Sequence, residues 1–387
     1  MRSIELFAGA GGLGLGAERG GTIPQLVVER DRWCCDTISA NRKDVLKLWP
    51  EPLRSDINHV DFRHLDGGID IVTGGPPCQP FSLGGKHKAH DDHRDMWSQA
   101  VRAVRETRPK AFVFENVKGL TRSSFSDYLS YIFLQLSYPM VEKKGSCEEW
   151  HEHLSRLEQH HTSGNHADLH YQVIPPKVLN AANYGVPQRR ERVFFVGFRS
   201  DLGANWTFPK ATHSLDALLH DQSVRGAYWD MHNVSRSRRT VITKSQKDFD
   251  TNLLPWKTVR DALIGLPDPQ EYPERSAIFK NHRFQPGAKI YPGHTGSPID
   301  LPAKALKAGV HGVPGGENMM VKDDGSVRYF TIRESARLQT FPDEFEFSGS
   351  WSEAMRQLGN AVPVDLAHAV TESVIEQIAM LSPEGNA

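Results

Sequence analysis

An apolar run that ends abruptly at glycines and prolines constrains this chain more than any other stretch. Residues 69–73 are typical of a buried strand in a parallel sheet, and the sequence GGPPCQPFS follows at 74–82. The glycines and prolines end the strand and fix a rigid turn. This turn is expected to hold Cys78 at the carboxyl end of a strand, where open α/β sheets bind ligands. A free cysteine is more often a small buried hydrophobic residue, but the rigid turn and the polar neighbours Gln79 and Ser82 favour a nucleophile.

A second glycine-rich turn lies near the N-terminus. A predicted strand at 3–7 leads into the pattern G-x-G-x-x-G at 9–14, and a helix follows. Between a strand and a helix, such a loop lets the backbone approach a ligand closely. The next predicted strand, 26–28, ends at Glu29, whose carboxylate suits the two hydroxyl groups of a ribose. Taken alone, these residues indicate an adenosine-containing cofactor, with NAD still open and a purely structural turn as the alternative.

Two more strand ends carry acidic side chains. Residues 111–114 form an apolar run that ends at Glu115, and Asp56 and Ile57 follow a further predicted strand. Because neighbouring parallel strands end at one edge of a sheet, Glu115 is expected to face the same crevice as Cys78. Because a thiol is expected nearby, we interpret Glu115 as a carboxyl that hydrogen-bonds or protonates a substrate ring. A helix-capping acid is the alternative. Asp56 and Ile57 suit the edge of an adenine.

A basic segment precedes the predicted strand at 193–197. Period-two alternation puts Arg190 and Arg192 on the same side of this strand. Two guanidinium groups directed together suit a phosphate backbone or a polarised carbonyl oxygen. A solvated rim of charges is the alternative, and this motif alone does not exclude it.

The composition is that of a globular protein. The 387 residues carry a net charge of −1, and no apolar run approaches the roughly 20 residues that a membrane span needs. No signal peptide precedes the first strand, and the four cysteines show no CxxC pairing. We therefore expect a reducing, cytoplasmic location and no membrane association. A monomer is a separate expectation. The charge argues against a wholly electrostatic coat for nucleic acid, but a local basic cleft stays open.

The order of the patterns divides the chain into three parts. Residues 1–204 are predicted as a catalytic α/β part, residues 205–329 as a smaller, loop-rich domain, and residues 330–387 as a segment that rejoins the first part. A histidine-rich insertion is predicted at 143–169. His151 and His153, near the start of its expected helix, are two residues apart and share no helical face. We therefore predict a surface insertion without a metal, and a zinc site is the less favoured alternative.

Six motifs in this order resemble those of the DNA (cytosine-5)-methyltransferases. Any one of them can arise by accident, but all six together are very specific. They read FAGAGG at 7–12, PPCQPFS at 76–82, ENV at 115–117, QRRER at 188–192, RESARLQ at 333–339 and GNAVP at 359–363. The match leaves out the insertion and most of residues 205–300.

The resemblance implies a Rossmann-like, S-adenosylmethionine-dependent methyltransferase domain with a smaller target-recognition domain. It implies double-stranded DNA as the partner and a prokaryotic, stand-alone modification enzyme paired genetically with a restriction endonuclease. The catalytic residues it implies are Cys78, Glu115, Arg190 and Arg192, with DNA contacts from Gln79 and Ser82. The cofactor site it implies is lined by Phe7, Ala10, Gly11, Gly12, Glu29, Asp56, Ile57, Pro77, Asn360 and Val362.

The implied reaction methylates C5 of cytosine. The thiolate of Cys78 adds to C6 while Glu115 hydrogen-bonds the ring nitrogen, and the two arginines bind the base oxygen and adjacent phosphates. C5 then takes the methyl group and loses a proton, and the thiol is eliminated. Because a stacked base cannot be reached, the cytosine must be flipped out of the duplex, and residues 83–94 are the expected lid.

Two positions depart from the family pattern. Arg30 stands where members often carry an aromatic residue, and Ala305 stands where the small domain usually carries a threonine. Two rivals are a family member that acts on tRNA and a binding module that lost the chemistry. The loop-rich region of about 125 residues argues against the first. The presence of all four catalytic residues argues against the second.

Overall fold

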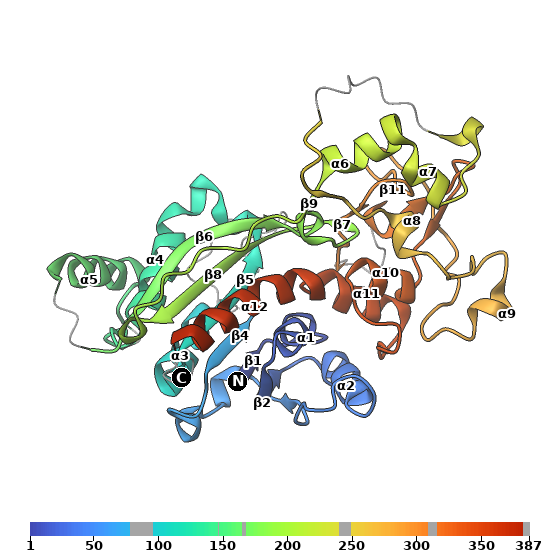
Figure 1. Ribbon diagram of the computed structural model, residues 1–387. Coiled ribbons are helices and arrows are strands. Elements are labelled where there is room, and N and C mark those ends of the chain that lie inside the picture. Colours follow the sequence, from blue (N-terminus) through green and yellow to red (C-terminus); the bar gives the residue numbers. More distant parts are fainter. Residues whose placement is uncertain (78–95, 146, 165–167, 240–248, 309–315, 382–387) are drawn as a thin grey trace.

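A seven-stranded sheet forms the centre of the molecule (Figure 1). The computed structural model describes residues 1–77, 96–145, 147–164, 168–239, 249–308 and 316–381. The strand order is β3-β2-β1-β4-β5-β8-β6, with the bounds β1 Arg2–Leu6, β2 Ile23–Glu29, β3 Leu53–Arg54, β4 Ile71–Gly74, β5 Ala111–Val117, β6 Tyr171–Asn180 and β8 Glu191–Arg199. Strands β1 to β5 run parallel, whereas β8 is antiparallel to both β5 and β6. The predicted α/β fold is confirmed.

Helices cover both faces of this sheet, which explains why its central strands are apolar throughout. On β5, Phe112 and Phe114 join the core on the face of α3, where Trp97 contacts Phe114 edge-to-face at 6.0 Å between ring centroids. Val113 points the other way and joins Val370 of α12 in the second core. The helix bounds are α1 Gly12–Arg19, α2 Arg32–Asn41, α3 Trp97–Thr107, α4 Ser126–Ser137 and α12 Val364–Leu381.

The second half of the glycine pattern serves packing inside helix α1. A Cβ at Gly16 would lie 2.5 Å from the Cβ of Ala367 on α12, which packs alongside α1 (Figure 1). A Cβ at Gly14 would lie 2.7 Å from the ring of Trp49. Only the first half of the pattern forms the loop itself, because α1 already begins at Gly12.

Residues 205–329 form short elements that gather at one end of the molecule, opposite α5 (Figure 1). Their bounds, with those of β7 and the following helices, are β7 Gln188–Arg189, β9 His213–Ser214, α6 Leu215–His220, α7 Ala227–Met231, β10 Leu254–Pro255, α8 Val259–Ala262, α9 Pro273–Ser276, β11 Ser297–Pro298, β12 Ala303–Lys304, β13 Met319–Val321, β14 Val327–Tyr329, α10 Ile332–Leu338 and α11 Trp351–Asn360. The predicted domain limits stay a prediction. None of the helices in the described ranges has both the length and the apolar character of a membrane-spanning segment.

The histidine-rich stretch contains helix α5, Trp150–Ser163, which packs against α4. Its His153 is buried, with one ring nitrogen 2.9 Å from the Tyr131 hydroxyl and the other 2.7 Å from the Val141 carbonyl oxygen. Both nitrogens are therefore used within the protein. Within the described part of the chain, no three His, Cys, Asp or Glu side chains group so that they could hold a metal ion.

A carboxyl group is buried below the N-terminus of α1. Glu5 of β1 is 2% exposed and hydrogen-bonded to the Thr73 hydroxyl. Burial raises the pKa of Glu5 to about 8, although the Thr73 hydroxyl and the N–H of Gly14 both lower it. Glu5 thus supports the first turn of α1, where Gly14 lies, as a mostly protonated carboxyl at neutral pH.

Replacing Glu5 by glutamine is expected to remove a pH-dependent loss of stability. Folding raises the pKa of Glu5 from its ordinary value of 4.5 to about 8, so folding favours the protonated form. This stabilisation is complete below about pH 4.5 and is lost as the pH rises through 8, by up to about 1.4 kcal/mol per pH unit. Thermal unfolding measured between about pH 5 and about pH 9 should show a smaller pH dependence for Glu5→Gln than for the wild type. Parallel curves for the two proteins would contradict this role.

Candidate active site

The residues predicted from the strand ends gather at one edge of the large sheet. Because β1, β2, β4 and β5 run parallel, the glycine loop, Glu29, the turn at 75–77 and Glu115 all lie toward the carboxyl ends of their strands. Strands β2 and β3 lie on one side of β1, and β4 and β5 lie on the other. Open α/β sheets bind their ligands at this point of reversal.

A single carboxylate holds the shape of the loop after β1. Phe7, Gly9 and Gly11 have positive φ values of 54°, 55° and 87°, and Phe7 is a rare non-glycine residue in this region. Glu29 accepts hydrogen bonds from the N–H of Gly9 at 2.8 Å and from the N–H groups of Arg30 and Asp31 at 2.7 Å. These bonds use three of the roughly four acceptor positions of a carboxylate. The ribose contact stays a prediction for Glu29, which also shapes the loop.

The turn after β3 lies next to this loop. The N–H of Ser55 donates to the carbonyl oxygen of Glu29 at 3.1 Å, and Asp56 caps the short turn that begins with the buried Ile57. The guanidinium group of Arg30 lies 3.6 Å from the Asp56 carboxylate. The backbone N–H of Asn58 and, to a smaller degree, Arg30 lower the pKa of Asp56. Arg30, which departs from the family pattern, thus adds a positive charge beside Asp56.

The GNAVP motif meets the glycine loop from the other end of the chain. A Cβ at Gly12 would lie 2.4 Å from the carbonyl oxygen of Val362, so this contact requires glycine. Ala10 and Val362 are buried, whereas Asn360, the last residue of α11, is exposed. The structure therefore brings together residues that are more than 300 positions apart in the sequence.

The end of β5 carries a buried carboxylate–guanidinium pair. Nε of Arg192 on β8 lies 2.6 Å from Oε1 of Glu115, and the two side chains are only 12% and 9% exposed. A Cβ at Gly75 would lie 3.2 Å from Oε2 of Glu115. The side-chain amide of Asn116 donates to the carbonyl oxygen of Pro76 at 2.9 Å. The turn that leads to Cys78 is thus fastened directly to the end of β5.

Burial determines the proton affinity of Glu115. It raises the pKa of this carboxyl, against the lowering effects of Arg192 and Arg190. A carboxyl with a raised pKa can keep a proton closer to neutral pH, which is what a general acid needs. The local arrangement therefore suits donation of a hydrogen bond or a proton to a substrate ring.

Arg190 and Arg192 differ in what they contact. Arg190 is 1% exposed and donates hydrogen bonds to the carbonyl oxygens of Leu306, at 2.9 Å, and Gly359, at 2.5 Å. It lies between β7 and β8, where the N–H of Arg190 bonds the Gln188 carbonyl oxygen, so a simple strand alternation does not extend through it. The catalytic role predicted for Arg190 stays a prediction, and its contacts favour a different role.

Three predicted residues, Cys78, Gln79 and Ser82, lie outside the described residues, as does the expected lid. Pro77, the residue before Cys78, is exposed. The parts of this site that the structure describes are the turn at 75–77 and the end of β5.

Sequence reasoning missed the buried glutamine Gln188. Its Oε1 accepts the N–H of Leu306 at 2.9 Å, and its Nε2 donates to the carbonyl oxygen of Leu338 at 3.1 Å. The one available signal was its place at the start of the QRRER motif, which says nothing about its partners.

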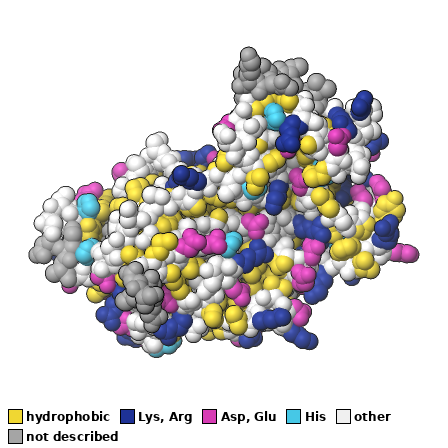
Figure 2. Space-filling model, viewed as in Figure 1, with side chains coloured by type: hydrophobic (Ala, Val, Ile, Leu, Met, Phe, Trp, Pro, Cys, Tyr) yellow, Lys and Arg dark blue, Asp and Glu magenta, His cyan; other side chains and the backbone are white. Residues whose placement is uncertain are grey.

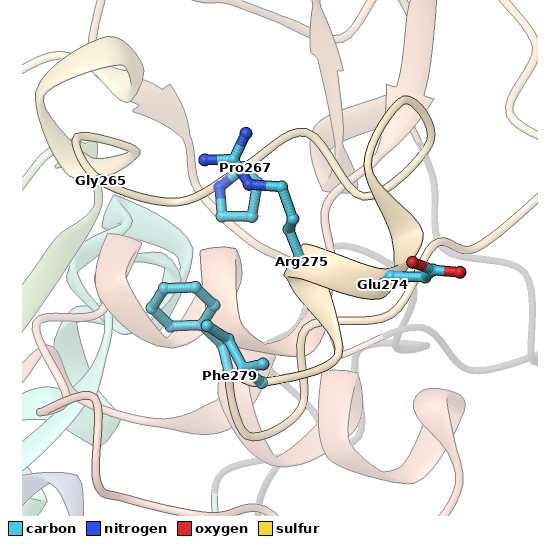
Figure 3. A pocket seen from close by; sticks show the side chains of 6 residues that line it. Gly265, Pro267, Glu274, Arg275 and Phe279 are labelled. Atoms are coloured by element: carbon cyan, nitrogen blue, oxygen red, sulfur yellow. The ribbon is translucent and has the colours of Figure 1, made fainter.

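A surface pocket in residues 205–329 does not belong to this site. Figure 3 shows its lining, which consists of Gly265, Pro267, Glu274, Arg275, Ile278 and Phe279. None of the residues predicted for catalysis or cofactor binding lines it. Basic and acidic side chains are interspersed on the face seen in Figure 2, in keeping with the near-zero net charge.

Comparison with known proteins decides the family. The profile of the C-5 cytosine-specific DNA methylases matches residues 1–138 and 154–376. The chain belongs to this family. The unmatched stretch, 139–153, overlaps the predicted insertion but is shorter. As a member of the family, the protein is a DNA (cytosine-5)-methyltransferase.

Curated relatives cover nearly the whole chain. The type II methyltransferase M.PspPI of Psychrobacter sp. is 32% identical over 377 residues, which cover 97% of this chain and 79% of that protein. M.Eco47II of Escherichia coli is 31% identical over 96% of this chain and 78% of its own length. M.AquIA of Picosynechococcus sp. is 34% identical over 73% of this chain and 98% of its own length.

Solved structures share the fold. The Entamoeba histolytica methyltransferase EhMeth gives a TM-score of 0.58 at 13% identity, over 98% of each chain. The S. pombe Dnmt2 methyltransferase gives a TM-score of 0.56 at 16% identity, over 99% of each chain. At this identity the likeness supports the fold and says nothing of the substrate.

Proposed function

We propose that this enzyme is the modification methyltransferase of a restriction–modification system. In this proposal it methylates C5 of a flipped-out cytosine at one DNA sequence through a covalent bond between Cys78 and C6. The observation that carries the proposal is the buried Glu115–Arg192 pair, fastened to the turn that precedes Cys78. The type II methyltransferases among the relatives support the biological setting.

The residues at the sheet edge fit S-adenosylmethionine as the methyl donor. Among the described residues, nothing lies within 4 Å of a Cβ built on Gly9, so a ligand can reach this backbone. Glu29 and Asp56 offer carboxylate oxygens beside it. Val362, from the C-terminal part of the chain, packs its backbone against Gly12. When bound, the cofactor supplies an electrophilic methyl group on a sulfonium.

Each protein group has a defined task in the proposed reaction. The Cys78 thiolate forms a bond with C6 while Glu115 gives a hydrogen bond or proton to the ring nitrogen, so that electron density moves to C5. Arg192 holds the Glu115 carboxyl in place at 2.6 Å and adds positive charge beside the base. Transfer of the methyl group to C5 would leave the cofactor as the neutral thioether. C5 then loses its proton to a base, the Cys78 thiolate leaves C6, and the ring nitrogen returns any proton it took to Glu115, so that the aromatic ring is restored.

A substrate analogue tests the covalent step. Fluorine at C5 cannot leave as a cation, so a DNA duplex with 5-fluorocytosine at the target should trap the enzyme in the presence of S-adenosylmethionine. We expect a stable protein–DNA adduct with the wild type and with Cys147→Ser, which removes an exposed thiol elsewhere. Cys78→Ser should give none. An adduct that survives Cys78→Ser would contradict the proposed nucleophile.

A further inference from the structure

Arg190 is a buried guanidinium group that interacts electrostatically with Glu115 but forms no direct ion pair with a carboxylate in the described part of the chain. Within the described residues it forms no ion pair, its two terminal nitrogens donate to backbone carbonyl oxygens, and its Nε has no hydrogen-bond partner. Burying a guanidinium in this way is costly. Because its hydrogen bonds go to backbone carbonyl oxygens, Arg190 can hold those backbone segments in place.

The two carbonyl partners of Arg190 belong to different parts of the chain. Leu306 follows strand β12 in the predicted recognition domain, and Gly359 lies near the end of α11. A Cβ at Gly359 would lie 2.2 Å from the N atom of Ala308, so the two backbones are in direct contact. Arg190 thus donates hydrogen bonds to both of the backbone segments that touch here, one at residues 306–308 and one at Gly359.

Gln188, two residues before Arg190, bonds the same region around Leu306. Its amide bonds the N–H of Leu306 and the carbonyl oxygen of Leu338, and its backbone pairs with Ala303 as β7 lies parallel to β12. Both side chains are almost fully buried. Arg192, two residues after Arg190, forms the ion pair with Glu115.

We infer that Arg190 is a positioning residue: together with Gln188 it couples the recognition domain to the Glu115–Arg192 pair. Strand β12 and the end of α11 cannot shift against β8 without breaking these bonds. When the recognition domain binds its DNA sequence, a shift of β12 is thereby transmitted through residues 188–192 to the Glu115–Arg192 pair. This inference rests on the proposed function only for its effect on turnover, because the mechanical coupling concerns the free protein.

Hydrogen–deuterium exchange of the full chain tests the coupling without any substrate. Gln188→Leu and Arg190→Met should each speed amide exchange in residues 303–308 by about tenfold or more, since each removes buried hydrogen bonds. The double variant should exchange little faster than the more affected single variant, because both act on one contact. Arg189→Ala, a neighbouring exposed arginine, should leave this exchange unchanged. Arg190→Lys keeps a cation and a hydrogen-bond donor, so residues 303–308 should exchange more slowly in Arg190→Lys than in Arg190→Met. This variant serves as the test if Arg190→Met folds poorly.

Turnover then separates positioning from direct contact. Gln188→Leu and Arg190→Met should lower kcat in similar proportion and leave the Kd for S-adenosylhomocysteine unchanged. Arg190→Met that lowers kcat without faster exchange at 303–308 would overturn the inference, because Arg190 would then act on the substrate itself. Independent, additive effects of the two substitutions on exchange would overturn it as well. If the wild type does not methylate DNA, the proposed function fails, and the exchange results alone decide the coupling.

Discussion

Replacing Glu115 by glutamine should lower the rate of methyl transfer by about 10²- to 10⁴-fold, while DNA and cofactor still bind. The amide of glutamine can occupy the same space beside Gly75 and accept a hydrogen bond from Arg192, which keeps the shape of the site and reduces the cost of leaving the buried guanidinium without a carboxylate. It has no acidic proton to share with a ring nitrogen. The loss should therefore appear in kcat, measured as methyl groups transferred per enzyme at saturating DNA.

Glu191→Gln is the matched control for this substitution. Glu191 is an exposed acid at the start of β8, and its side chain pairs with Lys118 at 2.9 Å. Arg192 bonds only the backbone carbonyl oxygen of Glu191, which the substitution keeps. An exposed pair of this kind contributes little to stability. Its removal should leave kcat within a few-fold of the wild type. A Glu115→Gln enzyme that turns over as fast as Glu191→Gln would contradict the role of Glu115.

Replacing Arg192 by leucine should cost both activity and stability. Removing one partner of a buried ion pair leaves an uncompensated charge, which typically costs about 3–5 kcal/mol. Because Arg192 lowers the pKa of Glu115, its loss lets burial raise that pKa further. The cost should therefore be small below about pH 4.5, where the carboxyl is protonated in folded and unfolded chains alike, and should grow as the pH rises.

The double variant Glu115→Gln, Arg192→Leu distinguishes charge from packing. Without the carboxylate, the missing guanidinium leaves no buried charge, so the double variant should recover most of the lost free energy of unfolding at neutral pH. Methyl transfer should stay as low as in the single variants. Denaturant titrations at several pH values measure this. A double variant as unstable as Arg192→Leu would show that the leucine disrupts packing and that the charge is not the cause.

The positions of the strand ends at the candidate site could be predicted from the sequence because they depend on local patterns. The apolar runs before Gly74 and Glu115 form β4 and β5, and the glycine and proline positions mark where the first of these ends. A parallel sheet then brings such ends to one edge by its geometry. The glycine pattern at 9–14 was informative about the loop, but half of it lies in α1 and serves helix packing.

The partners of buried polar side chains could not be predicted in this way. Arg190 bonds residues 116 and 169 positions away, and no periodicity or spacing in the sequence records such contacts. For the same reason, the three backbone N–H groups bound by Glu29 were not foreseen. The patterns at 126–137 and 351–360 also did not lead us to predict helices, although α4 and α11 lie there.

Methylation of C5 through Cys78 is tested most directly by bisulfite sequencing of plasmid DNA from cells that express this protein, beside cells that express Cys78→Ala. We expect cytosines protected from conversion within one short recurring sequence, present with the wild type and absent with Cys78→Ala. Full conversion of every cytosine in the wild-type plasmid, with the protein folded and expressed, would contradict site-specific C5 methylation of DNA. Protection that persists with Cys78→Ala would contradict the proposed nucleophile.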